Sequence, residues 1–325
     1  MIKKIKILIV TVFLTAFGGV TYASFTDGLN AAIEGDYKTA LKEWQSLADQ
    51  GNASAQYNLG LMYDNGRGVL KDYKQAAKWY RKAADQGHTS AQYNLGEMYA
   101  NGEGVLKDDK QAVKWYRKAA DQGDADVQYN LGVMYAKGRG VLKDYKQAVK
   151  WYQKAADQGY AGAQLNLGVM YANGEGVLKD DKQAVKWYRK AADQGHTSAQ
   201  YNLGLMYENG RGVLKDYKQA TKWYRKAADQ GDADAQYNLG VMYYKGKGAL
   251  KDYKQAVKWY QKAADQGYAS AQHNLGFMYA YGEGVLKDLS KAKYWIKKAY
   301  ENPSANSKTK NLAEENLNEL ELWKY

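Results

Sequence analysis

Apolar residues recur along this chain at the spacing of helices. One set, spaced i, i+4, i+7 and i+8, consists of Ala55, Leu59, Met62 and Tyr63. A second set, spaced i, i+3, i+4, i+7 and i+8, consists of Ala76, Trp79, Tyr80, Ala83 and Ala84. Each set places its apolar residues on one stripe of a helix. No stretch alternates with a period of two residues, as a half-buried strand would. The pattern therefore predicts an all-α protein.

Glycines and short polar residues mark the ends of these two helices. Gly66 and Gly68 are expected to end the first helix, because glycine tolerates the left-handed conformation of a C-terminal cap. Asp72 is expected to cap the second helix, and Gln75 three residues later to complete a capping box. Gly87 follows the second helix and closes it.

This two-helix unit recurs every 36 residues between residues 52 and 303. The segment Gln56-Tyr57-Asn58-Leu59-Gly60 returns from Gln92, Gln128, Gln164, Gln200, Gln236 and Gln272, with substitutions at Leu165 and His273. Seven copies without insertion or deletion predict a solenoid. Gly60 returns in each copy although glycine inside a helix costs about 1 kcal/mol relative to alanine. Its recurrence indicates a close approach between helices.

The segments that flank the repeats are expected to cap the stack, because an uncapped repeat would expose an apolar face. Residues 24–51 have the pattern of a degenerate helix pair with a short loop at residues 34–36. Residues 304–325 follow Pro303 and form the other cap. Its amphipathic helix is marked by Leu312, Ala313, Leu317 and Leu320.

The repeated unit resembles the Sel-1-like repeat, a relative of the tetratricopeptide repeat. It carries Ala-x-Ala-Gln-Tyr-Asn-Leu-Gly-x-Met-Tyr, then Gly-x-Gly-Val-x-Lys-Asp-Tyr and Ala-x-Lys-Trp-Tyr-x-Lys-Ala-Ala. The resemblance covers residues 52–303 fully and 25–51 loosely. It implies a right-handed α-solenoid and adaptor roles: scaffolding, peptide or protein binding and, in exported bacterial members, envelope maintenance or host interaction. The chain departs from the family at Leu70 and its equivalents, where Pro is common. It also lacks the Cys that form disulfides within the helix pairs of some exported relatives.

Residues 1–23 have the features of a secretory signal peptide. Three basic residues precede an uncharged apolar run at residues 7–17, and Thr21-Tyr22-Ala23 places small residues at the −3 and −1 positions of a cleavage site. The alternative is an uncleaved anchor, but the run is shorter than the roughly 20 residues of a spanning helix. We expect cleavage after Ala23 and a periplasmic or secreted protein. With no Cys after the site to carry a lipid, no stable membrane anchor is expected after cleavage.

The composition argues against a catalytic centre. The chain has no Cys and three His, which excludes a thiol nucleophile and a Cys-ligated zinc and leaves little for a His-rich metal site. His88 and His196 stand at helix starts and are expected to face solvent. Ser-x-x-Lys occurs at Ser290 and Ser307, but the Ser-Asp-Asn and Lys-Thr-Gly boxes of penicillin-recognising enzymes are missing. We expect no catalytic residue, no cofactor and no metal.

Basic residues dominate the charge: 47 Lys and Arg stand against 35 Asp and Glu, a net charge of +12. Lys74, Lys78 and Lys82 predict a solvated row on each second helix, or alternatively a surface for acidic envelope polymers or lipid head groups. Nucleic acid is not an expected partner of an exported protein. One position per loop mostly alternates in sign, which would let neighbouring loop tips pair: Arg67, Glu103, Arg139, Glu175, Arg211, Lys247 and Glu283.

A longer period lies over the repeats. Residues 124–159 and 232–267 differ at four positions, so a block of three repeats is duplicated. Two similar halves favour an extended or repetitive ligand. A recent duplication without selection would leave the same pattern, and the sequence does not separate the two interpretations.

The function expected from these features is a non-catalytic protein- or peptide-binding scaffold of the bacterial envelope or secreted space. In the tetratricopeptide fold the ligand contacts come from the first helix of each unit, on the side away from its apolar stripe. The resemblance maps this concave face onto Asn58, Asn94, Asn130, Asn166, Asn202, Asn238 and Asn274. Such an asparagine ladder suits the main-chain amides of an extended peptide. The alternative is that each Asn bonds the backbone of a neighbouring repeat.

Varied positions beside the ladder are the candidates for specificity. Three residues after each Asn stand Leu61, Glu97, Val133, Val169, Leu205, Val241 and Phe277. One turn further lie Asp64, Glu208 and Tyr244, and His273 replaces a recurrent Tyr on the expected binding face. Two other classes stay open: an envelope-acting enzyme or penicillin-binding, β-lactamase-like protein, as some relatives have been labelled, and a purely structural spacer.

Overall fold

The computed structural model describes residues 21–324, and within them it contains helices and turns but no strand. The prediction of an all-α protein is confirmed. The basic and apolar segments of the predicted signal peptide lie outside the described residues. α1 (Thr21–Glu34) begins before the predicted cleavage site, which falls in its first turn. No described helix is long and apolar enough to cross a membrane.

Each repeat contributes two helices of 13 residues. The first helices, called A helices here, are α3 (Ala53–Asn65), α5 (Thr89–Asn101), α7 (Ala125–Lys137), α9 (Ala161–Asn173), α11 (Thr197–Asn209), α13 (Ala233–Lys245) and α15 (Ala269–Tyr281). The second helices, the B helices, are α4 (Tyr73–Asp85), α6 (Asp109–Asp121), α8 (Tyr145–Asp157), α10 (Asp181–Asp193), α12 (Tyr217–Asp229), α14 (Tyr253–Asp265) and α16 (Leu289–Glu301).

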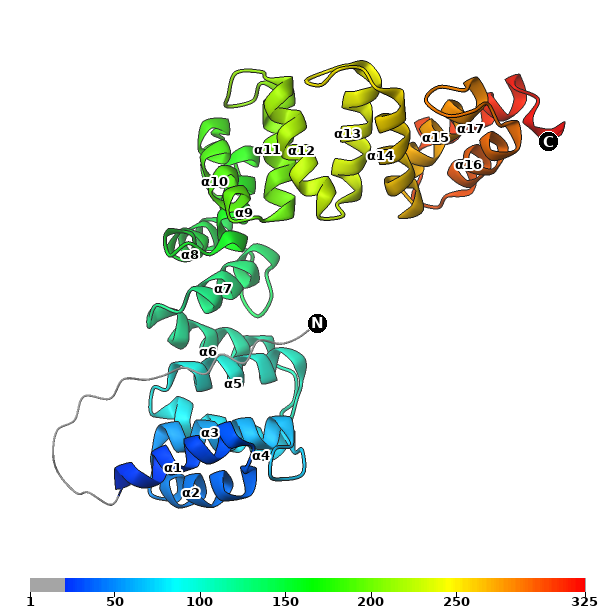
Figure 1. The fold of residues 1–325 in the computed structure, drawn as a ribbon. Coiled ribbons are helices and arrows are strands. Elements are labelled where there is room, and N and C mark those ends of the chain that lie inside the picture. The colour runs from blue at the N-terminus through cyan, green and yellow to red at the C-terminus, as the bar shows by residue number, and fades with distance from the viewer. Residues whose placement is uncertain (1–20, 325) are drawn as a thin grey trace. The chain divides into compact units, whose positions relative to one another are not determined.

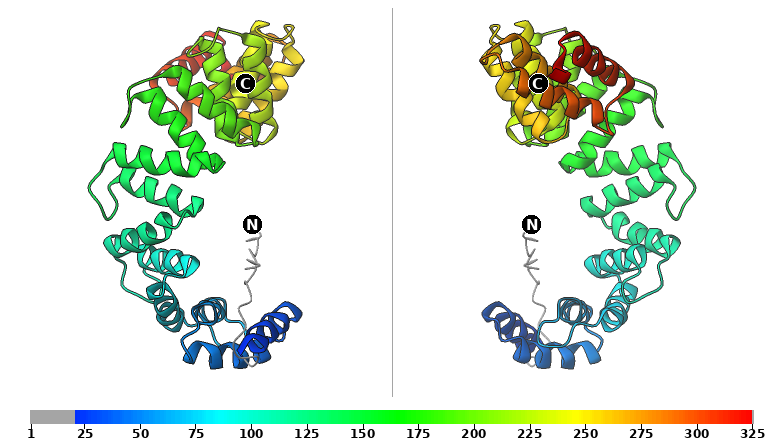
Figure 2. Two further views of the ribbon diagram at one scale, coloured as in Figure 1. Left: turned by 90° about the vertical axis from the view of Figure 1, so that its left-hand side faces the viewer. Right: turned by 90° about the vertical axis from the view of Figure 1, so that its right-hand side faces the viewer.

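The chain forms two units, and their described parts are residues 21–127 with 139–141 and residues 128–138 with 142–324. Within each unit the helices follow one another in chain order (Figures 1 and 2). Four B helices, α4, α10, α12 and α14, each contact the A helix of their own repeat and that of the following one, as α4 does with α3 and α5.

The helix ends follow from glycine and aspartate, as the sequence predicts. Gly66 caps α3 in the left-handed conformation at φ 68°, and its N–H donates to the Met62 carbonyl. Asp72 caps α4, accepting hydrogen bonds from the N–H groups of residues 74 and 75. The prediction of a capping box is wrong in one respect. The N–H of Asp72 donates to the Tyr63 carbonyl at 2.9 Å, so it is not free for the Gln75 side chain.

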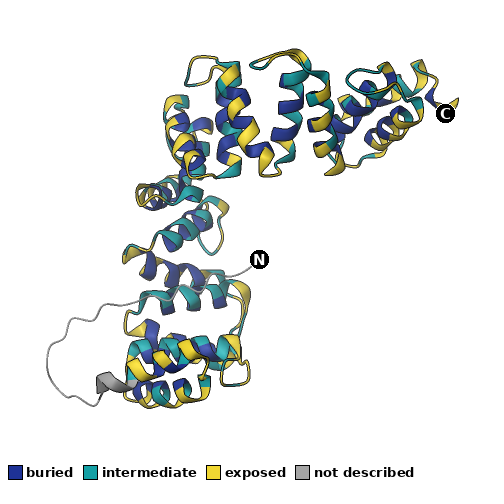
Figure 3. Cartoon of the chain, in the orientation of Figure 1, coloured by how far each residue is buried: buried dark blue, intermediate teal, exposed yellow. Residues whose placement is uncertain are grey.

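The hydrophobic core lies between repeats. One cluster joins Tyr80 of α4, Leu95 and Met98 of α5 and Trp115 of α6. Equivalent clusters are built around Trp79, Trp223, Trp259 and Trp295. The buried residues therefore line the faces where helices meet, and exposed residues lie on the opposite sides and the loops (Figure 3). A single helix pair cannot cover its apolar stripe without a neighbour.

Two glycines allow the close approaches that the repeat needs. A Cβ at Gly204 of α11 would lie 2.6 Å from Cδ1 of Tyr224 of α12, which confirms the expected contact between helices. In the loop, Gly212 has φ 67°, and a Cβ there would collide with the Asp181 carbonyl of the preceding repeat. The second loop glycine thus lets each loop lie on the start of the preceding B helix.

Helix pairs at both ends take the place of further repeats. α1 and α2 (Tyr37–Asp49) pack against α3, with Trp44 buried in the shared cluster. At the other end α17 (Ser307–Glu319) and a short 3-10 helix, η1 (Leu322–Lys324), cover α15 and α16 through Ala313 and Leu322. Leu312 was expected on this apolar face, but it is 38% exposed.

Candidate functional site

The seven predicted asparagines lie at equivalent places, each half-buried in the middle of an A helix. We call the part of the A-helix surface that carries them the asparagine face. In the first unit it holds Asn58 and Asn94. In the second it holds Asn130, Asn166, Asn202, Asn238 and Asn274. The varied residues three positions on are also half-buried, so both sets are partly accessible to solvent.

Four of the asparagines act on tyrosine hydroxyls of the preceding repeat: Asn94, Asn166, Asn238 and Asn274. Burial raises the pKa of Tyr57 and of Tyr80, and in both cases a side-chain hydrogen bond from Asn94 opposes this rise. Tyr201 is likewise raised to a pKa of about 12 by burial, and the side chain of Asn238 lowers it in part. The sequence left open a bond from each Asn to the backbone of a neighbouring repeat, and the effects seen here are on the pKa of tyrosine side chains. Each amide keeps further donor and acceptor capacity.

Asn58 differs from the other members of the ladder. The helices in front of it carry Phe25 and Trp44, whose rings lie 6.3 Å apart in the way that Tyr57 and Tyr80 lie 5.8 Å apart. Neither Phe nor Trp has a hydroxyl for the amide. Asn58 therefore lacks the tyrosine hydroxyls on which Asn94 and Asn238 act.

The glutamine two residues before each Asn is a structural residue that sequence reasoning missed. Gln92 is 4% exposed, and its side-chain amide donates to the Ala84 carbonyl at 3.1 Å. Its oxygen accepts a bond from Gln122 at 2.8 Å, and the Gln122 amide also donates to the Gly87 carbonyl. These bonds satisfy a buried polar group and join two repeats. The signal for this role was the recurrence of a polar residue beside the apolar stripe.

Acidic residues near the ladder contact buried tyrosines of the B helices. Glu97 accepts a hydrogen bond from the Tyr116 hydroxyl, and Glu208 accepts one from Tyr224 at 2.6 Å. Burial is the main cause that raises the pKa of both tyrosines, and the carboxylates add to it. These two candidates for specificity thus also hold the A and B helices of one repeat together.

Two aromatic candidates lie near the C-terminal end of the ladder. Burial, with a hydrogen bond to Glu283, raises the pKa of Tyr244 to about 12, and its ring lies 5.2 Å from that of Tyr253. The ring of Phe277 lies 4.4 Å from that of Tyr281, which is 53% exposed. Both offer apolar area for contact.

His273 lies beneath the C-terminal cap. It is 8% exposed, its Nε2 lies 2.8 Å from the amide nitrogen of Asn316 of α17, and burial lowers its pKa. His273 is therefore covered by α17 and is not open to a partner, which differs from the expectation. The replacement of Tyr by His at this position fits the packing of α17 against α15.

The sequence predicted that the two other histidines, His88 and His196, face solvent. In the structure they do not. The His88 ring stacks on Tyr57 at 4.6 Å, and its Nδ1 accepts a hydrogen bond from the Ala91 N–H that caps α5. Burial lowers the pKa of both His88 and His196. The physical reason is the tight turn between repeats, which places the N-cap side chain against the preceding A helix.

Two charged loop tips pair with the preceding B helix and not with another tip, which differs from the prediction. Arg139 contacts Asp109 at 2.9 Å and Arg211 contacts Asp181 at 2.6 Å, and each Asp is the first residue of the preceding B helix. Where that first residue is Tyr217, the tip residue Lys247 lies over its ring. On the outer face of the B helices, the predicted lysine row is exposed: Lys74, Lys78 and Lys82.

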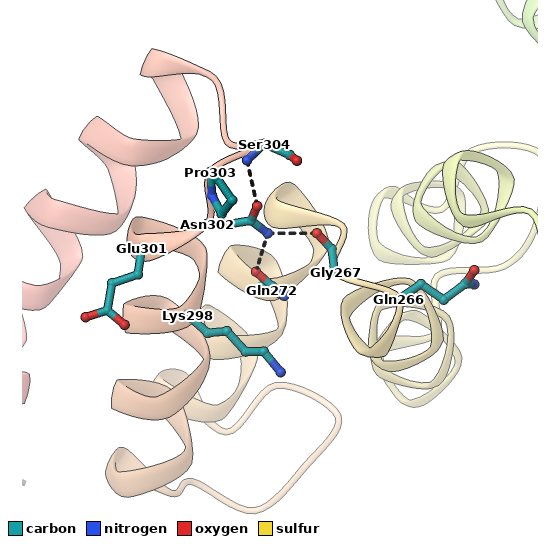
Figure 4. A pocket seen from close by; sticks show the side chains of 8 residues that line it. All are labelled: Gln266, Gly267, Gln272, Lys298, Glu301, Asn302, Pro303 and Ser304. Carbon is teal, nitrogen blue, oxygen red and sulfur yellow. Dashed lines mark hydrogen bonds between the residues drawn. The ribbon is translucent and has the colours of Figure 1, made fainter.

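A shallow polar pocket lies at the end of the last repeat (Figure 4). Asn302 takes the place of the recurrent glutamine and donates to the Gly267 carbonyl at 2.7 Å and to Gln272 at 3.1 Å. Its amide is thus engaged in holding the repeat. Within residues 21–324 no group of three His, Cys, Asp or Glu side chains is placed to hold a metal ion. Ser290 and Ser307 are exposed, and Lys293 lies 3.5 Å from the Trp323 carbonyl.

The family model of the Sel1 repeat matches seven consecutive segments of the chain, which together run from residue 53 to residue 304. The chain belongs to the Sel1 repeat family. The boundaries of the matched segments agree with the structural repeat, in which an A helix is followed by a B helix and a turn.

Two solved structures are similar over most of this Sel1 repeat protein. A Sel1 repeat protein from Oxalobacter formigenes is 36% identical, with a TM-score of 0.72 over 91% of this chain and 86% of that one. The protein c5321, a protective antigen present in uropathogenic Escherichia coli strains, is 32% identical, with a TM-score of 0.50 over 94% of this chain and 83% of that one. A comparison with curated proteins gave no match.

Proposed function

We propose that this Sel1 repeat protein is a non-catalytic scaffold of the bacterial envelope or secreted space that binds an extended protein segment or peptide along the asparagine face. One observation carries the proposal. In each repeat a half-buried Asn lies next to a varied residue, on a framework whose core is formed by other residues. The Asn supplies polar groups at a regular spacing, and the varied residue differs in size and charge from repeat to repeat.

The asparagine amide is suited to main-chain recognition. An Asn side chain has two donors and an acceptor oxygen, and a contact with one tyrosine hydroxyl leaves others for a ligand. The varied positions include Glu97, Leu205 and Phe277, so an extended peptide would meet different side chains along its length. Acidic envelope polymers are a second class of partner, supported by the exposed lysine row of the B helices.

Location outside the cytoplasm is part of the proposal. The features of residues 1–23 support export. The similarity to a protective antigen adds support, since an antigen that protects is accessible to the host. We infer that the exported chain is the functional form, with the signal peptide removed after Ala23.

Site-specific cross-linking tests the binding face. A photoreactive phenylalanine analogue is placed at Leu205 or Val241, and as a matched control at Lys222 on the outer face of α12, in cells that export the chain. We expect the same cross-linked protein partner from both A-helix positions and none from Lys222. A product from Lys222 alone would assign binding to the outer face and refute the proposal.

The alternative of a penicillin-binding or β-lactamase-like enzyme has a direct test. Such an enzyme needs an activated nucleophile beside a base, but Ser290 and Ser307 are exposed residues in the first turns of α16 and α17. We expect the purified chain to leave nitrocefin unchanged. Turnover that persists through further purification would favour the enzyme over the scaffold.

A further inference from the structure

Seven leucines, one in the loop between the A and B helices of each repeat, project into solvent. Their exposed fractions run from 90% to 92% at Leu70, Leu106, Leu142, Leu178, Leu214, Leu250 and Leu286. The residue before each behaves differently, since Val213 packs against the core while Leu214 is 91% exposed. We call these seven residues the loop-tip leucines.

The loop is anchored on both sides of the leucine. Before Leu214, the N–H of Gly210 and that of Arg211 donate to the Met206 carbonyl. After it, the N–H of Asp216 donates to the Tyr207 carbonyl at 3.0 Å. Because both ends of this short loop are fixed, the leucine is held outward by the fold itself.

Neighbouring loops in the second unit lie on the same edge of the stack. Gly212 lies against the Asp181 carbonyl, Gly248 against Tyr217 and Gly284 against Tyr253. Each contact joins a loop to the residue that directly follows the preceding loop. The loops after α11, α13 and α15 accordingly emerge on one side of this unit (Figure 1).

Exposed lysines surround each leucine of the second unit. Leu214 is followed by Lys215, and Lys218 stands in the first turn of α12; both lysines are exposed. The Lys215 ammonium is held 5.0 Å from the centre of the Tyr217 ring. The neighbouring tips carry exposed lysines at the same two positions, with Lys179 and Lys182 beside Leu178 and with Lys251 and Lys254 beside Leu250.

We propose that the loop-tip leucines of the second unit, with their flanking lysines, bind an anionic lipid surface. A single leucine flanked by lysines fits a lipid boundary. The acyl chains accept the leucine side chain, and the phosphate groups pair with the lysine ammonium groups. A protein partner would instead need a series of pockets at the repeat spacing. This surface is separate from the asparagine face, so it is independent of the function proposed above.

The test uses the chain from residue 24 onward, which keeps each described core cluster because the first residue packed into any of them is Phe25. Sedimentation with vesicles of phosphatidylglycerol and phosphatidylcholine in equal parts measures binding, with pure phosphatidylcholine as the comparison. The variant changes Leu178, Leu214 and Leu250 to Ser. If each leucine inserts the equivalent of one methylene, binding should fall roughly 50-fold, while the melting temperature stays unchanged.

Matched lysine variants separate tip binding from general charge attraction. Changing Lys179, Lys215 and Lys251 to Gln should lower binding on the order of 100-fold at low salt. Changing Lys186, Lys222 and Lys258 of the outer face to Gln should have a much smaller effect on binding.

Three results would overturn the proposal. The first is a wild-type chain that does not bind the phosphatidylglycerol vesicles. The second is a leucine variant that binds them as well as wild type, and the third is an equal loss from both lysine variants. A wild-type chain that fails to bind vesicles, together with a leucine variant that loses the protein partner found by cross-linking, would mean that the loop-tip leucines bind a protein.

Discussion

Truncation of one buried tryptophan tests whether the repeats stabilise each other. Trp223 of α12 is 6% exposed and packs into a cluster with residues of α10 and α11, such as Tyr188 and Leu203. Trp223 belongs to one repeat, but the core cluster around it also includes residues of the preceding repeat. Replacing Trp223 with Ala removes its side chain from this shared cluster. The loss should therefore be felt on both sides of the repeat boundary.

The expected cost follows from the area involved. A tryptophan buries roughly 150–250 Å², which at about 25 cal/mol per Å² gives about 4–6 kcal/mol as an upper bound. Measured truncations of this kind cost about 3–5 kcal/mol. The Lys226 ammonium lies 4.2 Å from the indole centre, but an exposed cation–π contact adds only about 0.5–1 kcal/mol. Loss of core packing dominates.

Urea unfolding and amide hydrogen exchange measure the effect. We expect Trp223→Ala to lose about 4 kcal/mol of unfolding free energy and to lose amide protection in α10 as well as in α11 and α12. Trp323→Ala is the matched control, because that side chain is 66% exposed and its loss should change stability by less than about 0.5 kcal/mol. Protection lost only in α11 and α12 would refute the shared core.

Two further outcomes follow from polar groups. Burial holds the pKa of His88 below its ordinary 6.5, so below that pH the unfolded chain takes up a proton that the folded chain does not, and stability should fall as the pH drops from 7 toward about 5. The variant His88→Asn copies the N-cap Asn52. Its unfolding free energy, measured in urea, should depend less on pH than that of wild type. An equal dependence on pH would contradict the attribution of this effect to His88. Asn94→Ala should lower stability by about 1 kcal/mol, whereas Asn58→Ala, without tyrosine hydroxyls in front of it, should leave thermal melting nearly unchanged; equal losses would argue against the tyrosine contact.

The sequence was sufficient for the helices, their ends and the buried stripes. The repeat spacing, the cap glycines and the apolar stripe of Trp79 all agree with the structure, in which Trp79 and its equivalents at 115, 151, 187, 223 and 259 are 3–6% exposed. These features depend on local conformation and on amphipathic spacing, and both are written within one repeat. A period of 36 residues without gaps then applies each local rule seven times.

Contacts between repeats could not be predicted in the same way. Arg211 was expected to pair with another loop tip, but it reaches Asp181, which is 30 residues earlier in the chain. The capping box failed for a different reason, within one repeat, because the Tyr63 carbonyl occupies the N–H of Asp72. His88 was expected in solvent, yet it stacks on Tyr57 of the preceding repeat. Such partners depend on how one helix pair sits on the next, which periodicity does not encode.

Recurrence alone does not distinguish a structural residue from a binding residue, but recurrence combined with burial does. Gln92 recurs and is 4% exposed with its amide bonded to the preceding helix, so packing accounts for it. Leu214 recurs equally but is 91% exposed, so core packing does not account for it. The asparagines lie between these extremes: they are half-buried, and some of them, such as Asn238, act on a tyrosine hydroxyl. A contact surface on this scaffold is therefore best sought where a residue recurs without being buried, and its selectivity where half-buried positions vary.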